Sequence, residues 1–279
     1  MDKKKLLIDL WDWTTDIVSV STPILNALGI PITPQSSIIF GKTAKFLMSL
    51  GFTEVVHDIN TRHLSSMQME KVDDVTKATI RALYRMIENN GWDETHPESD
   101  QYIQNAIEYA EDILCKAMNE SRKKKRELLG NYLGTTLYTI NMSKPNWENI
   151  FYLSSLLNKL TLRQIVITKL IANHFEQLID DKDDWNCITN KVVISEVKEL
   201  SIQNIWIGLI SRQPDPTYLA LPLKYILPTD IAVELSAAVD ESVHDYTDDV
   251  IKSLDLKPYS QTGLPADFIM LMKRKRSMI

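Results

Sequence analysis

Apolar residues recur three and four positions apart from Asp100 to Phe175, and this spacing constrains the fold more than any other feature of the sequence. Because an α-helix turns once every 3.6 residues, the spacing places these side chains along one helix face. The apolar stripe consists of Ile103, Ala106, Ile107, Ala110, Ile113, Leu114 and Ala117, then Leu128, Leu129, Tyr132, Leu133 and Leu137, then Ile150, Leu153, Leu157 and Leu160. We therefore predict a row of long amphipathic helices in this part of the chain.

The ends of these helices are marked by residues that stop and start helices. Ser143–Pro145 closes one helix, and Trp147 opens the next. A break follows at Leu160–Thr161. Thr161 and Gln164 have the spacing of a capping box, in which side chains bond to the unpaired amides of a first helical turn. We predict that a further helix begins there.

Two glycines, Gly130 and Gly134, lie four positions apart on one face of a predicted helix. Each costs the helix about 1 kcal/mol relative to alanine. The pair indicates either a close crossing with another helix or two glycines that the helix merely tolerates, and the sequence leaves both interpretations open.

Further helices are expected on the N-terminal side, at residues 4–19, 38–50, about 58–63 and 69–88. Gly51 ends one of them, since glycine readily adopts the left-handed conformation that closes a helix, and Asn90–Gly91 ends another. Ser21–Pro23 and Ile30–Pro34 are expected to interrupt the chain, because proline lacks the amide that a helix interior requires.

The C-terminal part of the sequence is predicted to form shorter helices and strands. Residues 191–195 are β-rich by composition, helices are predicted over 194–208 and 231–243, and strands over 209–212 and 219–227. Thr229 is a suitable N-cap for the last helix. This order predicts a small winged-helix-like unit that contains a short β-hairpin.

Only eight of the 279 residues are glycine, which favours helices over turn-rich sheets. The predicted fold class is all-α, mainly a helical bundle, with the winged-helix-like unit toward the C-terminus. The predicted divisions are an N-terminal helix and linker (1–36), a helical bundle (37–158), the winged-helix-like unit (159–250) and a C-terminal tail (251–279).

Charge and cysteine content narrow the class of protein. A net charge of −6 argues against a globally basic nucleic-acid binder. The two cysteines, Cys115 and Cys187, are too few for a disulfide framework and are expected to be thiols in a reducing cytoplasm. The sequence has no run of about 18 apolar residues, so we expect no membrane span.

Motifs for catalysis are missing from the sequence. It has no glycine-rich phosphate loop, no Gly-x-Ser-x-Gly turn and no His-Glu-x-x-His or Cys-x-x-Cys spacing. We therefore predict no catalytic residue, metal ligand or cofactor, and favour a non-enzymatic protein. The loop Asp180–Asp184 lacks the glycine and glutamate of a calcium loop. The acidic residues around His244, from Asp240 to Asp249, leave a metal-dependent hydrolase as a weaker alternative.

Two features are candidates for binding. The basic runs are Arg122, Lys123, Lys124, Lys125 and Arg126, and Lys273, Arg274, Lys275 and Arg276. Such runs can contact nucleic-acid phosphates, although they can equally be a solvated helix face and a mobile tail. Trp11 and Trp13 lie on the apolar face of the first helix and are candidate partner-binding residues, because aromatic side chains dominate many interfaces. The helix after Thr229 is a second candidate contact surface.

Several segments carry a family resemblance: Ile39–Leu47, Lys124–Leu133, Leu157–Ile165 and the module from Ile207–Ile210 to Pro228–Thr229. In these, over about residues 38–240, the chain resembles bacterial helical proteins of the abortive-infection alpha type and relatives carried by phages and mobile elements. It departs from them in having no glycine-rich linker before the module, and its tail after Asp249 has no counterpart. The resemblance implies a part in phage–host conflict and carries no catalytic residues.

Two functional hypotheses follow from these observations. The first is a non-enzymatic component or regulator of a bacterial antiphage or mobile-element conflict system, which acts by binding another protein of the same system. The second is a nucleic-acid-associated helical protein that uses the two basic runs.

Overall fold

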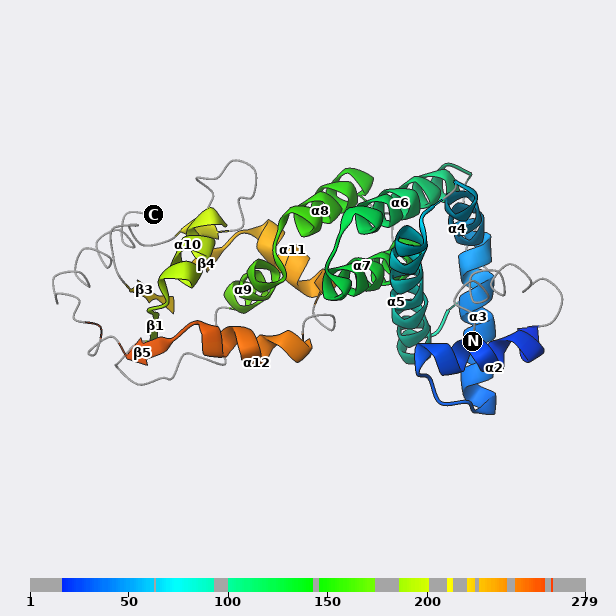
Figure 1. Cartoon of the computed structure of the whole chain (residues 1–279), viewed down its shortest axis with the longest axis horizontal. Helices are drawn as coiled ribbons and strands as arrows, with labels where there is room; N and C mark the ends of the chain where they lie inside the picture. The colour runs from blue at the N-terminus through cyan, green and yellow to red at the C-terminus, as the bar shows by residue number, and fades with distance from the viewer. Residues whose placement is uncertain are drawn as a thin grey trace. The chain divides into compact units, whose positions relative to one another are not determined.

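The computed structural model describes residues 17–62, 64–92, 100–142, 146–173, 186–200, 210–212, 220–223, 226–239, 244–258 and 262. The chain divides into two compact units, Met1–Asn158 and Lys159–Ile279 (Figure 1). Helices make up most of the described residues, with a short antiparallel hairpin in the second unit. The prediction of a mainly all-α fold with a short β-hairpin is therefore confirmed.

The described part of the first unit is helical. Its helices are α2 (Ile17–Leu28), α3 (Pro34–Ser49), α4 (Phe52–Thr61), α5 (Ser66–Asn90), α6 (Asp100–Asn119), α7 (Lys123–Met142) and α8 (Trp147–Lys159). Most side chains of the apolar stripes predicted for residues 100–160 are buried, and Ile103, Ile107 and Ile150 are half-buried, so the central periodicity identified the core-facing side of α6, α7 and α8. Trp11 and Trp13 lie outside the described residues.

The two breaks expected near the N-terminus have different outcomes. The break at Ile30–Pro34 is confirmed, because α2 ends at Leu28 and α3 begins at Pro34. The break expected at Ser21–Pro23 is wrong. Helix α2 runs through Pro23, which is exposed, while Ile24, Leu25 and Leu28 on the other side are buried. Burial of that apolar face offsets the single backbone bond that proline removes. Pro34 begins α3 rather than preceding it, because a fixed φ suits the first helical position.

Helices α5 and α7 pack closely against each other. Both predicted glycines of α7 lie in this seam, against the backbone of α5. A Cβ atom on Gly130 would lie 2.4 Å from the Val75 carbonyl oxygen, and one on Gly134 would lie 2.5 Å from the Thr79 carbonyl oxygen. No side chain fits at such distances. The close-crossing interpretation is confirmed, and the interpretation as two merely tolerated glycines is wrong.

An aromatic cluster joins α6, α7 and α8. The ring of Tyr109 is buried, and its centroid lies 5.7 Å from Phe151, 6.3 Å from Tyr132 and 6.4 Å from Trp147 in edge-on arrangements. Edge-to-face packing at these distances is favourable because the positive ring edge meets the negative ring face. Burial holds the pKa of the Tyr109 phenol well above its usual value.

The second unit combines short helices with short strands. Its elements are α9 (Leu162–Ala172), β1 (Asn186–Ile188), α10 (Lys191–Glu199), β2 (Ile210–Arg212), β3 (Leu221–Pro222), β4 (Leu227–Pro228), α11 (Asp230–Val239), α12 (His244–Ser253) and β5 (Leu256–Pro258). Strands β3, β1 and β5 form one antiparallel sheet, in that order, and β2 pairs with β4 as a hairpin with an irregularity between Ile210 and Arg212.

Helix starts in this unit follow their capping residues. Thr161 caps α9 as predicted: its hydroxyl accepts from the Gln164 amide at 3.1 Å, and the Gln164 side chain accepts from the Thr161 amide at 2.9 Å. The Thr229 hydroxyl accepts from the Ala232 amide at 3.4 Å at the start of α11. Residues 240–243, the expected end of that helix, lie outside the described residues.

Three local predictions in the second unit were wrong. Residues 191–195 are not β-structure but the first turns of α10, because Asn190 caps the helix and the burial of Val193, Ile194 and Val197 outweighs the β-preference of these residue types. The predicted strand 219–227 divides between two sheets as β3 and β4. The predicted tail from residue 251 contains β5, which pairs with β1. Residues 201–209, the rest of the helix predicted over 194–208, lie outside the described residues.

Candidate functional site

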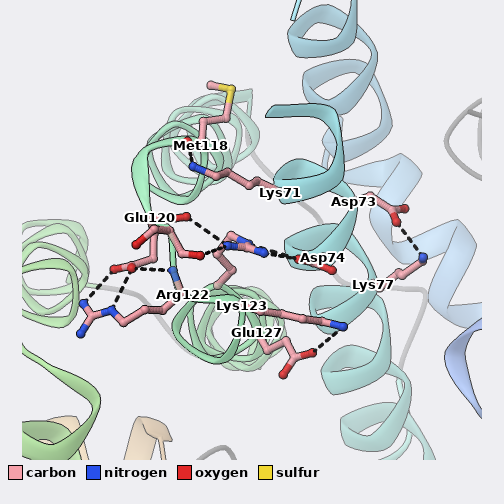
Figure 2. Close-up of polar contacts among 11 residues, drawn as sticks. Lys71, Asp73, Asp74, Lys77, Met118, Glu120, Arg122, Lys123 and Glu127 are labelled. Carbon is pink, nitrogen blue, oxygen red and sulfur yellow. Dashed lines mark hydrogen bonds and ion pairs between the residues drawn. The ribbon is translucent and has the colours of Figure 1, made fainter. Parts of the chain in front are cut away.

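Part of the first basic run is used in ion pairs within the N-terminal unit. Glu120, between α6 and α7, accepts hydrogen bonds from Arg122 Nε at 3.0 Å and Nη2 at 3.1 Å (Figure 2). Glu120 Oε2 also lies 3.4 Å from the ammonium of Lys125, whose side chain is only 2% exposed. Lys125 Nζ donates to the backbone carbonyl of Asn158 at 2.5 Å. Lys125 is therefore a buried structural cation.

Arg126 is buried as well. Its Nε and Nη2 donate to Asp74 Oδ2 of α5 at 3.1 and 2.7 Å. Its Nη1 donates to the carbonyls of Glu120 and Ser121 at 3.1 and 2.8 Å, just beyond the end of α6. Carbonyls at a helix end lack partners within the helix, so this guanidinium satisfies them while it links α5 to α7.

The same region contains two more contacts that involve α5. Lys71 Nζ donates to the Met118 carbonyl at 2.8 Å, and Lys77 pairs with Asp73 at 2.6 Å (Figure 2). Lys71 and Asp74 thus connect the N-terminal half of α5 to the end of α6 and to Arg126 of α7. The Lys77–Asp73 pair, by contrast, lies within α5, on another side of the helix (Figure 2). The first basic run thus meets acidic side chains and helix-end carbonyls.

The ionisation of this network follows from its burial and its charges. Burial by itself would raise the pKa of Glu120, but hydrogen bonds from Arg122 and the nearby charge of Lys125 outweigh it and lower the pKa from 4.5 to about 2. Burial lowers the pKa of Lys125, while Glu120 opposes that shift. Glu120 is therefore a fixed anion at any physiological pH.

Arg122, Lys123 and Lys124 remain on the surface at the start of α7. Lys123 lies 3.9 Å from Glu127 and is 66% exposed (Figure 2). Of the first basic run, these three residues can reach a phosphate without unfolding. The second run, Lys273 to Arg276, lies outside the described residues.

A hollow of about 550 Å³ lies between the α2–α3 loop and α5. The loop contributes Gly29, Ile30, Pro31 and Thr33, and the first turn of α3 contributes Gln35 and Ser36. Helix α5 contributes Arg81, Tyr84, Arg85 and Glu88. The volume falls within the range of ligand-binding clefts in proteins.

Local sequence fixes the loop side of the hollow. Gly29 has φ +71° and closes α2 in a Schellman motif, with the Ile30 amide donating to the Leu25 carbonyl at 2.9 Å and the Gly29 amide donating to the Asn26 carbonyl at 3.1 Å. Thr33 and Ser36 then form a capping box at the start of α3. The five-residue loop is held at both ends, so this wall is formed before any ligand arrives.

The α5 side of the hollow is predominantly cationic. Arg81 Nε donates to the Leu28 carbonyl at 3.2 Å, which ties α5 to the end of α2, and Arg85 follows one turn later. Tyr84 is buried between them, and burial together with the charge of Glu88 raises the pKa of its phenol. Two arginines against one glutamate make the hollow locally positive on a chain whose net charge is −6.

Two exposed apolar side chains flank this hollow in the sequence. Ile32, within the loop, is 52% exposed, and Ile38, in the second turn of α3, is 64% exposed. Neither residue was among the predicted binding residues. One available signal was that Ile32 lies between Pro31 and Pro34, outside any predicted helix.

A serine, a lysine and an aspartate also meet between α6 and α8, but not as a catalytic group. Lys116 Nζ donates to Ser154 Oγ at 2.7 Å and pairs with Asp112, and Ser154 Oγ lies 3.1 Å from Asp112 Oδ2. Ser154 is 0% exposed, so its hydroxyl cannot reach a substrate. The neighbouring thiol of Cys115 has its pKa raised by burial, which keeps it protonated and unreactive.

Within the described ranges, no three acidic, histidine or cysteine side chains gather in a way that would hold a metal ion. His57 is exposed on α4. The side chains from Asp240 to Tyr246, which carry most of the acidic cluster around His244, lie outside the described residues. The metal-dependent alternative therefore stays a hypothesis.

The comparisons with known proteins give no relative for this chain. No protein-family model, curated protein or solved structure matches it. None of the helices in the described segments combines the length and apolarity needed to span a bilayer.

Proposed function

We propose that the chain is a non-enzymatic binding protein of a bacterial antiphage or mobile-element conflict system, which acts in the cytoplasm through contacts with another protein of that system. The observation that supports protein binding best is in the segment of the α2–α3 loop and the start of α3, which lines a preformed hollow and also carries the exposed side chains of Ile32 and Ile38. Exposed apolar side chains next to a concave surface are typical of protein contact sites.

The conflict system is proposed on the family resemblance alone. The segments Ile39–Leu47 and Lys124–Leu133 that carry it lie in α3 and α7, which are packing elements of the N-terminal unit. A shared packing pattern supports a shared fold more directly than a shared function.

The test of this proposal is a plaque assay. A phage-sensitive bacterial host that expresses the chain with its genomic neighbours should give fewer plaques than the same host without the chain. The double variant Ile32→Asp, Ile38→Asp should lose this protection. Met67→Asp is the matched control, because Met67 is exposed on α5 and does not line the hollow. Equal plaque counts with and without the chain would contradict the proposal.

A second candidate function is association with nucleic acid, favoured by the exposed Arg122, Lys123 and Lys124. Binding to a generic duplex at low salt should weaken steeply as salt increases, because released counterions drive it. Lys123→Ala with Lys124→Ala should reduce binding and leave folding intact. Lys125→Ala is unsuitable as a probe, since it removes a buried ion pair. No binding at low salt would end this candidate.

A further inference from the structure

We propose that the hollow between the α2–α3 loop and α5 binds an acidic segment of a partner protein, with partner carboxylates on Arg81 and Arg85 and a partner apolar side chain against Ile32 and Ile38. This inference rests on the proposed function, because it names the chemistry of the protein partner. It adds where the partner binds and which of its side chains are recognised.

Charge complementarity is the first argument. The hollow contains two guanidinium groups and one carboxylate, although acidic residues outnumber lysine and arginine in the whole chain. Arginine presents a planar set of donors that matches a carboxylate with two parallel hydrogen bonds. Arg81 uses its Nε on the Leu28 carbonyl, which orients the guanidinium at the hollow and leaves its terminal nitrogens as further donors.

The shape of the site favours a peptide over a small anion. A small anion at a helix N-terminus is held by unpaired backbone amides. At the start of α3, the Ser36 and Ser37 amides already bond to Thr33, and Pro34 has no amide. Arg81 and Arg85 lie one helical turn apart, about 6 Å along α5, a spacing that suits two carboxylates on one extended segment.

Two exposed apolar side chains in the segment that lines the hollow supply the second part of the recognition. Ile32 and Ile38 are more than half exposed on a loop and a helix whose geometry is fixed by the Schellman motif and the capping box. A surface that is already ordered loses little conformational entropy when a partner binds. An acidic segment that also carries a leucine, isoleucine or phenylalanine would contact both the arginines and these two isoleucines.

The test is a selection of random 12-residue peptides displayed on phage particles against the full-length protein. We expect the enriched peptides to combine aspartate or glutamate with a neighbouring large apolar residue. Synthetic copies should bind the wild-type protein in fluorescence anisotropy and weaken with added salt. Arg85→Glu should weaken binding by at least about tenfold, as for loss of a charge-assisted contact, and Arg85→Gln should have an intermediate effect.

Lys123→Glu is the matched control, because it makes the same charge change at an exposed position outside the hollow and should leave affinity unchanged. Circular dichroism checks that each variant is folded. The inference is overturned if no peptide is enriched, if enriched peptides lack acidic residues, or if Arg85→Glu binds them as well as the wild type. Self-association abolished by Arg85→Glu would also overturn it, since the occupant would then be a second copy of this chain.

The plaque assay separates this inference from the proposed function. Suppose that the double variant Ile32→Asp, Ile38→Asp abolishes protection while Arg85→Glu retains it. The proposal of protein binding is then supported, and the proposal of an acidic partner segment is contradicted. If the chain gives no protection but peptides bind as expected, the site stands and its place in a conflict system does not.

Discussion

A buried cation requires a counter-charge, and Glu120 supplies it for Lys125. We expect Glu120→Gln to lower the free energy of unfolding at pH 7 by about 2 kcal/mol, because it leaves the Lys125 ammonium in a dry site without its anion. Urea denaturation measures the loss. Glu127→Gln is the control, since its partner Lys123 is exposed and 3.9 Å away. That variant should change stability by less than about 0.5 kcal/mol.

The lowered pKa of Glu120 predicts how the free energy of unfolding depends on pH. The pKa of Glu120 is about 2 in the folded protein and near 4.5 when unfolded, so its ionised form adds stability above pH 4.5. That contribution is lost as the pH falls toward 2, because the unfolded state then binds a proton more readily than the folded state. The stability difference between wild type and Glu120→Gln should therefore narrow between pH 4.5 and 2. A difference that stays constant over this range would contradict the assignment.

All five residues of the first basic run were predicted to share one role. The helical periodicity of the sequence nevertheless separates the residues that face inward from those that face outward. Counting back three and four residues from Leu128 and Leu129 leads to Lys125, which therefore continues the apolar stripe and faces inward. The partners could not be predicted this way. Asp74 and Asn158 lie far from the run in sequence, and only the packing of α5 and α8 beside α7 brings them near it.

At the level of elements, the seam between α5 and α7 depends on its glycines. Alanine is the better helix former by about 1 kcal/mol, so propensity alone favours Gly130→Ala and Gly134→Ala. A Cβ at 2.4 or 2.5 Å from a backbone carbonyl of α5 would instead force the helices apart. We expect each variant to lose at least about 2 kcal/mol in urea denaturation. Lys124→Ala, on the exposed side of α7, should change stability by no more than about 0.5 kcal/mol. If Gly130→Ala or Gly134→Ala were more stable than the wild type, the close crossing of α5 and α7 would be contradicted.

The cap of α9 gives a prediction for the second unit. Thr161→Ala removes the hydroxyl that accepts from the Gln164 amide, and we expect a loss of about 1 kcal/mol. Thr161→Ser keeps the hydroxyl and should retain most of that stability. Thermal unfolding followed by circular dichroism compares the three proteins. Equal losses for alanine and serine would show that the methyl group, rather than the cap, is responsible.

Several helix ends could be predicted from local signals, although the signal at Pro23 was wrong. The capping box of Thr161, the opening of α8 at Trp147 and the stop at Gly91 were all visible in the sequence. Prediction failed where tertiary burial overrides local preference, as in the β-branched start of α10. The hollow was not predicted, because its walls come from segments far apart in the sequence, such as Arg81 of α5 and the end of α2, 53 residues earlier.

On the scale of the whole molecule, each compact unit has a buried core of its own. We expect two thermal transitions in calorimetry. Leu83→Ala should destabilise the first unit and Leu200→Ala the second, each by about 2–5 kcal/mol, since both leucines are fully buried. Each variant should lower the Tm of one transition only. A single transition that both variants shift equally would mean that the units unfold together.

The bond between Lys125 and the Asn158 carbonyl fixes the last residue of the first unit to the middle of that unit. If the chain were pulled at a point after this residue, the end of α8 would not be the first part to detach. The force would act on Lys125 and, through the ion pair of Lys125 with Glu120, on the turn between α6 and α7. The C-terminal end of α8 is therefore anchored to the interior of the first unit.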